Sequence, residues 1–212
     1  MALLRTAIAC LLLMTLPFAS LAEDETGAGE AVSLLQPLKG DHVLGDVNAP
    51  VTIIEYASLS CSHCATFHIE TFPDLKKQYI DTGKVVFVYR HFPLNDPALR
   101  GAMLAECSGD KFHTFLKVMF NTQPKWAYSG DYIEGLRGLA NVGGMSNEKF
   151  DACMADKALD TRLIENMQAA ANELGVSGTP ALFINGEMLT GEANFDTLAS
   201  IIDATLEEKD AQ

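Results

Sequence analysis

Two cysteines three positions apart are the residues of this sequence best suited to chemistry. Cys61-Ser62-His63-Cys64 forms a C-x-x-C motif between a β-branched apolar run and a helix-forming segment. At the start of a helix, unpaired backbone N–H groups and the helix dipole favour an anion, so Cys61 is predicted to carry a stable thiolate. His63 can add a positive charge or a hydrogen bond to that sulfur. Cys64, one turn further on, is expected to be more buried and less acidic.

This asymmetry predicts thiol–disulfide exchange with other proteins. A stable thiolate makes Cys61 a good leaving group, so a Cys61–Cys64 disulfide is easy to reduce. A substrate thiolate would attack Cys61, Cys64 would depart, and a second substrate cysteine would resolve the mixed disulfide. The competing interpretations are a structural disulfide, two unrelated cysteines and a structural zinc site. Zinc is disfavoured because His63 lies between the cysteines, His68 lies a full turn beyond, and there is no second C-x-x-C.

Two more segments are candidate parts of the site. Thr179-Pro180 directly precedes the apolar run 181–184, and a proline that enters a strand often retains a cis bond, so Pro180 is predicted to be cis. The alternative is an ordinary strand-entry proline. Glu55 lies in an apolar run six residues before Cys61, where an ionised carboxylate is costly unless it is solvated or paired. It is a candidate to accept the proton of Cys64, and the alternative is that it points to solvent or to Lys84.

The remaining conspicuous polar and aromatic residues receive structural interpretations. Four histidines share no ligand spacing and are expected at the polar surface or the edge of the core: His42, His68, His91 and His113. Neither a metal nor another cofactor is expected. Trp126 and Tyr128 lie in a segment bounded by proline and glycine, which suggests a loop that helps to line a peptide groove.

The elements that must position these residues alternate between strand and helix. Residues 51–56 and 85–89 have the profile of buried strands, and the segment between them predicts a helix kinked at Pro73 and stopped by Gly83. Residues 97–174 contain only helical runs. Asn185-Gly186 predicts a hairpin over residues 181–189, and a closing helix follows over residues 195–207. With the first two strands parallel, the prediction is an α/β sheet that carries a helical insertion.

An acid in the first strand, C-x-H-C, a helical insertion and Thr-Pro before a late strand resemble the DsbA family of thioredoxin-like proteins over about residues 41–208. The resemblance implies a thioredoxin-like core over residues 41–96 and 175–208, with residues 97–174 inserted between the second strand and the cis-proline strand. It also implies an acidic active-site cysteine and an oxidising couple, properties for which DsbA itself is the standard example.

The resemblance also bears on substrate binding. In a thioredoxin-like fold the Thr179-Pro180 loop faces the reactive cysteine, so Thr179 is expected to offer backbone groups to an extended substrate and a hydroxyl to Cys61. Ser62 stands where the best-known member has proline, and Thr179 replaces its valine. Threonine before the cis-proline also occurs in disulfide isomerases.

The other two cysteines outside the N-terminal segment are far apart in the sequence. The chain is closer to the DsbA branch that carries a second cysteine pair in the helical insertion, which implies a structural disulfide between Cys107 and Cys153. The alternative is two buried, reduced thiols.

The N-terminal residues predict export. Arg5, a short apolar run and the small-residue pattern Ser20-Leu21-Ala22 have the layout of a cleavable signal peptide over residues 1–22, with Cys10 inside it. An uncleaved anchor is the alternative, although the run is shorter than the roughly 20 residues of a spanning helix. Residues 23–40 are expected to form a flexible leader before a single domain. The net charge of -13 disfavours nucleic acid and anionic membrane surfaces as partners.

These observations together predict a monomeric periplasmic oxidase. Its expected partners are folding exported proteins with free cysteines and, as the resemblance implies, a DsbB-like membrane oxidase that reoxidises it. A disulfide isomerase or reductase is the first alternative, but isomerases usually need a dimerisation region, and only the short leader precedes the redox fold. A copper(I)-binding thiol chaperone is the second alternative.

Overall fold

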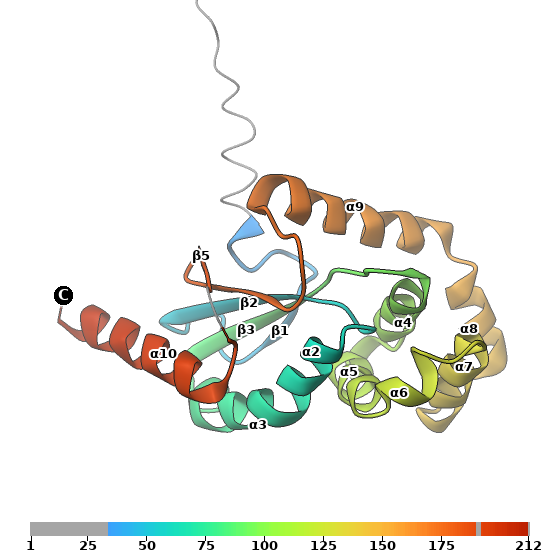
Figure 1. Cartoon of the computed structure of the whole chain (residues 1–212), viewed down its shortest axis with the longest axis horizontal. Helices are drawn as coiled ribbons and strands as arrows, with labels where there is room; N and C mark the ends of the chain where they lie inside the picture. Colours follow the sequence, from blue (N-terminus) through green and yellow to red (C-terminus); the bar gives the residue numbers. More distant parts are fainter. Residues whose placement is uncertain (1–33, 190–191, 212) are drawn as a thin grey trace, which may run out of the picture.

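A computed structural model describes residues 34–189 and 192–211. The predicted signal peptide and Cys10 lie outside the described residues. Five strands form one sheet in the order β1-β3-β2-β4-β5 (Figure 1). The strands are β1 (His42–Leu44), β2 (Val51–Ala57), β3 (Val85–His91), β4 (Ala181–Ile184) and β5 (Glu187–Met188).

The register of the sheet sets which side chains face each other. β2 and β3 run parallel, as predicted, and the other three strand pairs are antiparallel. Glu55 of β2 lies beside Tyr89 of β3, which in turn lies beside His42 of β1. These three polar side chains therefore project from the same face of the sheet, because neighbouring residues in register share a face. The hairpin β4–β5 turns at Asn185-Gly186, where both residues have positive φ.

One face of the sheet is covered by a continuous helical segment from Ser62 to Ile80. It comprises α2 (Ser62–Thr66), the π-helical turn η1 (Phe67–Thr71), α3 (Phe72–Leu75) and a second π-helical turn η2 (Lys76–Ile80). Pro73 lies in the first turn of α3, and Gly83 follows the segment with a φ of 76°, as expected of a stop signal. The predicted closing helix α10 (Phe195–Asp210) packs against α3 on the same side (Figure 1).

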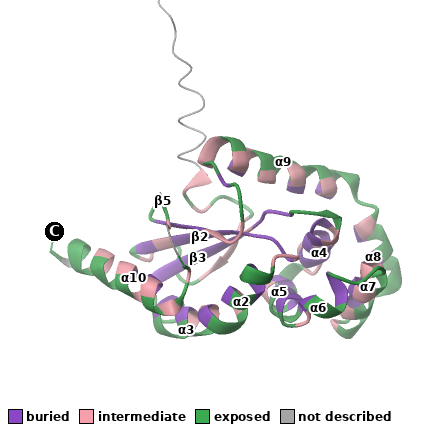
Figure 2. Ribbon diagram, viewed as in Figure 1, coloured by how far each residue is buried: buried purple, intermediate pink, exposed green. Residues whose placement is uncertain are grey.

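The insertion between β3 and β4 is entirely helical, as predicted. It contains α4 (Asp96–Cys107), η3 (Gly109–Lys111), α5 (Phe112–Asn121), α6 (Gln123–Trp126), α7 (Tyr132–Val142), α8 (Asn147–Met154) and α9 (Lys157–Leu174). Its last helix, α9, crosses to the other face of the sheet, where Ala170 joins a buried cluster with Tyr56 and Phe183. Buried residues concentrate on the strands and on the inward faces of the helices (Figure 2).

Two short elements and the segment around Trp126 differ from the sequence-based predictions. β1 is three residues long and α6 four, too short for a periodic pattern, so neither was predicted. The prediction that Trp126 lies in a loop that lines a groove is wrong. Trp126 is the last residue of α6 and is 1% exposed, and its indole N–H donates to the Met119 carbonyl at 2.9 Å. None of the helices in the described ranges is long and apolar enough to cross a membrane.

The flexible leader predicted over residues 23–40 ends too late in the sequence, because residues 34–40 belong to the folded domain. Its last seven residues, 34–40, lie within the described chain, and the Arg90 guanidinium binds their backbone. Arg90 donates to the carbonyl oxygens of Leu34 and Gln36 and forms an ion pair with Asp41. A half-buried guanidinium with five donors needs several acceptors, which explains why these residues lie against β3.

The predicted disulfide between Cys107 and Cys153 is present and joins α4 to α8. Cys153 is buried in a cluster with Met103 and Leu163, so the cross-link lies inside the packing of the insertion. The alternative of two reduced thiols is therefore wrong.

Candidate redox site

Cys61 lies where β2 is connected to α2. It occupies the N-cap position of α2 with extended backbone angles (φ -82°, ψ 122°), so the first turn of the helix directs its N–H groups toward the sulfur. The Cys61 thiol donates to the Thr179 carbonyl oxygen at 3.2 Å. The Thr179–Pro180 peptide bond is cis, as predicted. The loop before β4 therefore faces the half-buried Cys61.

Several hydrogen bonds lower the pKa of Cys61 to about 5. The Cys64 thiol makes the largest contribution, and partial burial opposes it. The Thr179 side chain and the backbone N–H groups of Cys64 and His63 lower the pKa further. The Thr179 hydroxyl is buried and has no hydrogen-bond partner in the described structure while Cys61 is a thiol, so it is free to turn toward a thiolate. His63 contributes through its backbone, while its side chain is exposed.

Cys64 has the opposite environment. It is 0% exposed. Burial raises its pKa most, and the hydrogen bond to Cys61 and the negative charge of Glu55 raise it further. The predicted contrast between an acidic, accessible cysteine and a buried, less acidic one is therefore present in the structure.

Glu55 is completely buried beneath the helical segment of residues 62–80 (the redox helix), and its Oε2 lies 2.7 Å from Nε2 of His68. The alternatives in which Glu55 faces solvent or Lys84 are therefore wrong. His68 lies at the edge of the core, one of the two places expected for it: its side chain is 7% exposed and stacks on Phe120 with ring centroids 4.3 Å apart. Cys64 and His68 are four residues apart on one helical face, which places both toward β2.

Gln123 is a further site residue that the sequence did not indicate. It is 2% exposed, and its Nε2 donates to the Leu59 carbonyl at 2.8 Å and to the Cys61 carbonyl at 2.9 Å. Its Oε1 accepts from the exposed Tyr128 hydroxyl at 2.9 Å. Through these bonds, α6 of the insertion fixes the loop that carries the reactive cysteine.

A groove of about 530 Å³ is lined by His63 of the C-x-x-C motif and by Thr179, the residue that contacts Cys61. It runs between the redox helix and the Thr179-Pro180 loop. Its lining residues are His63, Thr66, Phe67, Glu70, Thr71, Thr179, Pro180, Glu192, Ala193 and Asn194. Ser62, predicted to contact substrate, is exposed at the first position of α2 and does not line this groove.

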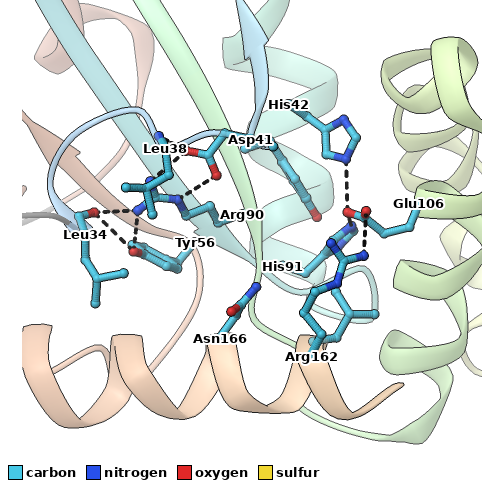
Figure 3. A pocket seen from close by; sticks show the side chains of 13 residues that line it. Leu34, Leu38, Asp41, His42, Tyr56, Arg90, His91, Glu106, Arg162 and Asn166 are labelled. Carbon is cyan, nitrogen blue, oxygen red and sulfur yellow. Dashed lines mark hydrogen bonds and ion pairs between the residues drawn. The ribbon is translucent and has the colours of Figure 1, made fainter. Parts of the chain in front are cut away.

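A second polar cluster lies between β1, β3, α4 and α9, beside a small pocket of about 110 Å³ (Figure 3). Glu106 Oε1 is 3.0 Å from His42 Nε2 and 3.6 Å from His91 Nε2, and Arg162 approaches its other oxygen at 3.4 Å. His91 is not at the surface, and burial lowers its pKa to about 4. In the described parts of the chain, no group of three or more acidic, cysteine or histidine residues is arranged to hold a metal.

The sheet, the redox helix and the cis-proline loop define a thioredoxin-fold protein with a dithiol site. A family model described as thioredoxin matches residues 38–204. The chain belongs to this family and, within it, to the DsbA-like thiol:disulfide oxidoreductases.

The relatives support this assignment over most of the described chain. The crystal structure of alpha-DsbA1 from Wolbachia pipientis matches with a TM-score of 0.79 and 33% identity, covering 84% of this chain and 96% of that chain. A Rickettsia felis protein named as a protein-disulfide oxidoreductase is 39% identical over 171 residues, which are 80% of this chain. This alignment spans only 61% of the length of that relative. A structure from Novosphingobium aromaticivorans described as a protein-disulfide isomerase is 27% identical, with a TM-score of 0.67, and the match covers 79% of this chain and 97% of that one.

Proposed function

We propose that this chain is an exported protein thiol:disulfide oxidoreductase that introduces disulfide bonds into folding proteins. The observation that supports this most strongly is the opposite environment of the two cysteines. Cys61 is accessible with a pKa of about 5, whereas Cys64 is buried with a raised pKa. A dithiol whose reduced form contains a stabilised thiolate favours reduction of its own disulfide, and such a protein oxidises its substrates.

In the proposed reaction, a substrate thiolate attacks Cys61 Sγ of the Cys61–Cys64 disulfide. The bond between the two enzyme sulfurs breaks, a substrate–Cys61 disulfide forms, and Cys64 leaves and takes up a proton. A second substrate cysteine then attacks the substrate sulfur of the mixed disulfide. Cys61 leaves as its stabilised thiolate, so the substrate is oxidised and the enzyme is left reduced.

Substrate binding in this proposal uses the backbone of the cis-proline loop. An extended substrate segment would pair with the Thr179-Pro180 loop, with its cysteine at Cys61 and its flanking residues in the adjoining groove. The Thr179 carbonyl already accepts from the Cys61 thiol, so the loop lies within bonding distance of the reacting sulfur. Ser62 and His63 would bound the entry side of this site.

The turnover requires an oxidant and a compartment in which disulfides persist. We assign these to a DsbB-like membrane partner and to the periplasm, reached through the signal peptide predicted over residues 1–22. The DsbA-like family and the presence of the Cys107–Cys153 disulfide support this assignment.

The equilibrium of the Cys61–Cys64 couple against glutathione tests the proposal. We expect a strongly oxidising couple in the wild type and no exchange in Cys61→Ser. The matched variant Cys64→Ala should still form a mixed disulfide at Cys61 but should not resolve it. A reducing couple, or exchange that survives Cys61→Ser, would contradict the proposed oxidase.

A disulfide isomerase is the second candidate, because of the threonine before Pro180 and the similarity to the Novosphingobium structure described as an isomerase. Two substrates separate the candidates: a fully reduced protein and the same protein with scrambled disulfides. An oxidase accelerates recovery of the first only, whereas an isomerase accelerates recovery of the second.

A further inference from the structure

Each turnover moves a proton at a buried sulfur. When Cys64 leaves the disulfide it is formed as a thiolate inside the protein, and it must gain a proton there. The reverse step must remove that proton. Cys64 is 0% exposed, so water cannot reach it directly, and a protein group must carry the proton.

Glu55 and His68 form an acid–base pair whose carboxylate acts on Cys64. Cys64 and His68 lie four residues apart on the same helical face, and Glu55 lies beneath that face on β2. Glu55 Oε2 is bonded to His68, while its Oε1 is buried without a hydrogen-bond partner. The negative charge of Glu55 raises the pKa of Cys64, so the carboxylate lies close enough to act on the sulfur.

His68 connects this pair to the protein surface. It lines a cavity of about 300 Å³ whose walls are mostly apolar and whose rim includes the exposed Pro73 and Lys117. Cys64 and Glu55 do not line this cavity. Among the three groups, His68 is therefore the one with a route to solvent, and this cavity shares no lining residue with the substrate groove.

We propose that His68 is a positioning residue that acts through Glu55: it holds the carboxylate toward Cys64 and exchanges protons between the carboxylate and solvent. This inference rests on the proposed oxidoreductase function. When Cys64 leaves the disulfide, Glu55 gives it a proton, and His68 replaces that proton from the cavity. When Cys64 attacks a mixed disulfide at Cys61, its proton passes to Glu55 and through His68 to solvent, and the other thiol leaves as a thiolate.

The groups around His68 leave Glu55 as its only close negative charge in the described chain. Tyr89 faces it from β3 with a pKa raised well above the ordinary value by burial, so its hydroxyl stays neutral. His113 lines the same cavity from α5, and burial lowers its pKa to about 4, so it is neutral near pH 7. The two cations on the cavity are Lys117 and Lys76, and Lys76 pairs with Asp81.

The test isolates the step in which Cys64 loses its proton. The reduced protein is converted to a mixed disulfide of Cys61 with glutathione, and release of glutathione by Cys64 is followed against pH. We expect His68→Gln to slow release by about 10²-fold or more, the usual contribution of a proton-transfer group, and to change the pH profile. His113→Gln is the matched control, because it lines the same cavity but does not bond Glu55, and its rate should equal that of the wild type.

Added imidazole distinguishes proton transfer from a structural role. In His68→Gly, imidazole has room to enter the cavity, and it should restore at least part of the lost rate. A wild-type rate and pH profile in His68→Gln would overturn the inference, as would a slow rate that imidazole fails to restore in a folded His68→Gly. If the glycine variant does not fold, the pH profile of His68→Gln decides alone. Failure of Cys61 to form the glutathione adduct in the wild type would overturn the proposed function and, with it, this inference.

Discussion

The low pKa of Cys61 depends on the burial of Cys64. Burial keeps the proton on Cys64, and that retained thiol is the strongest hydrogen-bond donor to the Cys61 thiolate. The charge of Glu55 also raises the pKa of Cys64, so it too helps keep the donor in place. The low pKa of Cys61 is therefore a property of the pair and of the carboxylate behind it.

The Thr179 hydroxyl is expected to stabilise the Cys61 thiolate. Thr179→Val removes the hydroxyl and keeps the shape of the side chain, so the pKa of Cys61 should rise and the couple should become less oxidising. Thiolate absorbance against pH measures the first effect, and the glutathione equilibrium measures the second. Thr179→Ser keeps a hydroxyl and should titrate like the wild type. An unchanged or lower pKa in Thr179→Val would show that the hydroxyl has no such role.

Gln123 should stabilise the loop that carries Cys61. Gln123→Leu removes the side-chain donor to the carbonyl oxygens of Leu59 and Cys61, and the Cys61 oxygen keeps only its bond from the Ala65 N–H. This should lower the free energy of unfolding by about 2 kcal/mol. Urea denaturation measures this loss. Tyr128→Phe removes the bonds of an exposed hydroxyl to the Gln123 oxygen and to the Ser60 carbonyl, and it should cost less. Equal losses in both variants would contradict the role of the two carbonyl bonds.

Whether a site residue could be predicted depends on how far along the sequence its partners lie. Cys61, Cys64 and the Thr179-Pro180 pair have local signals, namely a short motif and a proline before a strand, and Glu55 stands out as an acid in an apolar strand. The roles of His68 and Gln123 depend on partners 13 and 62–64 residues away. No local pattern encodes such a contact, so the sequence could not indicate either residue.

At the scale of elements, periodicity decided what could be predicted. The parallel strands, the redox helix and the long helices each contain enough residues to show an apolar pattern. β1 and α6 are too short to show such a pattern and are stabilised by tertiary contacts. α6 packs so closely on α7 that a Cβ at Gly135 would lie 2.9 Å from that of Trp126. A single aromatic residue in a four-residue helix carries no such information.

The disulfide between α4 and α8 should stabilise the insertion without altering the redox site. It closes a loop with a sequence separation of 46 residues, for which chain entropy gives about 4 kcal/mol. The double variant Cys107→Ala with Cys153→Ala should lose about this much free energy of unfolding, measured in the state with Cys61 and Cys64 reduced. The alkylation rate of Cys61 should stay at the wild-type value, and a large change in that rate would show coupling between the two cysteine pairs.

For the whole molecule, the low pKa of Cys61 links folding to both redox state and pH. The folded reduced protein contains a thiolate that the folded oxidised protein lacks. An interaction that stabilises this thiolate therefore stabilises only the reduced fold, and this preference is what drives the disulfide toward reduction.

The pH dependence of unfolding follows from the same linkage. The pKa of Cys61 is about 5 in the folded protein and about 8.5 in the unfolded chain, so the pKa is depressed by folding. The stabilisation is then complete above about pH 8.5, declines as the pH falls, and is lost below about pH 5. Because Cys61 is only half-buried, solvent screening reduces the linkage energy, and we expect about 2 kcal/mol.

Reduced wild type and reduced Cys61→Ser isolate this contribution, since the other titrating groups are shared. Their free energies of unfolding in urea should be equal at pH 4.5 and should separate progressively toward pH 8, with the wild type more stable. Above about pH 8.5 no further gain is expected, because the unfolded chain then ionises Cys61 as well. A difference that stays constant over this range would mean that the fold does not stabilise the thiolate, and an oxidising couple would then need another physical cause.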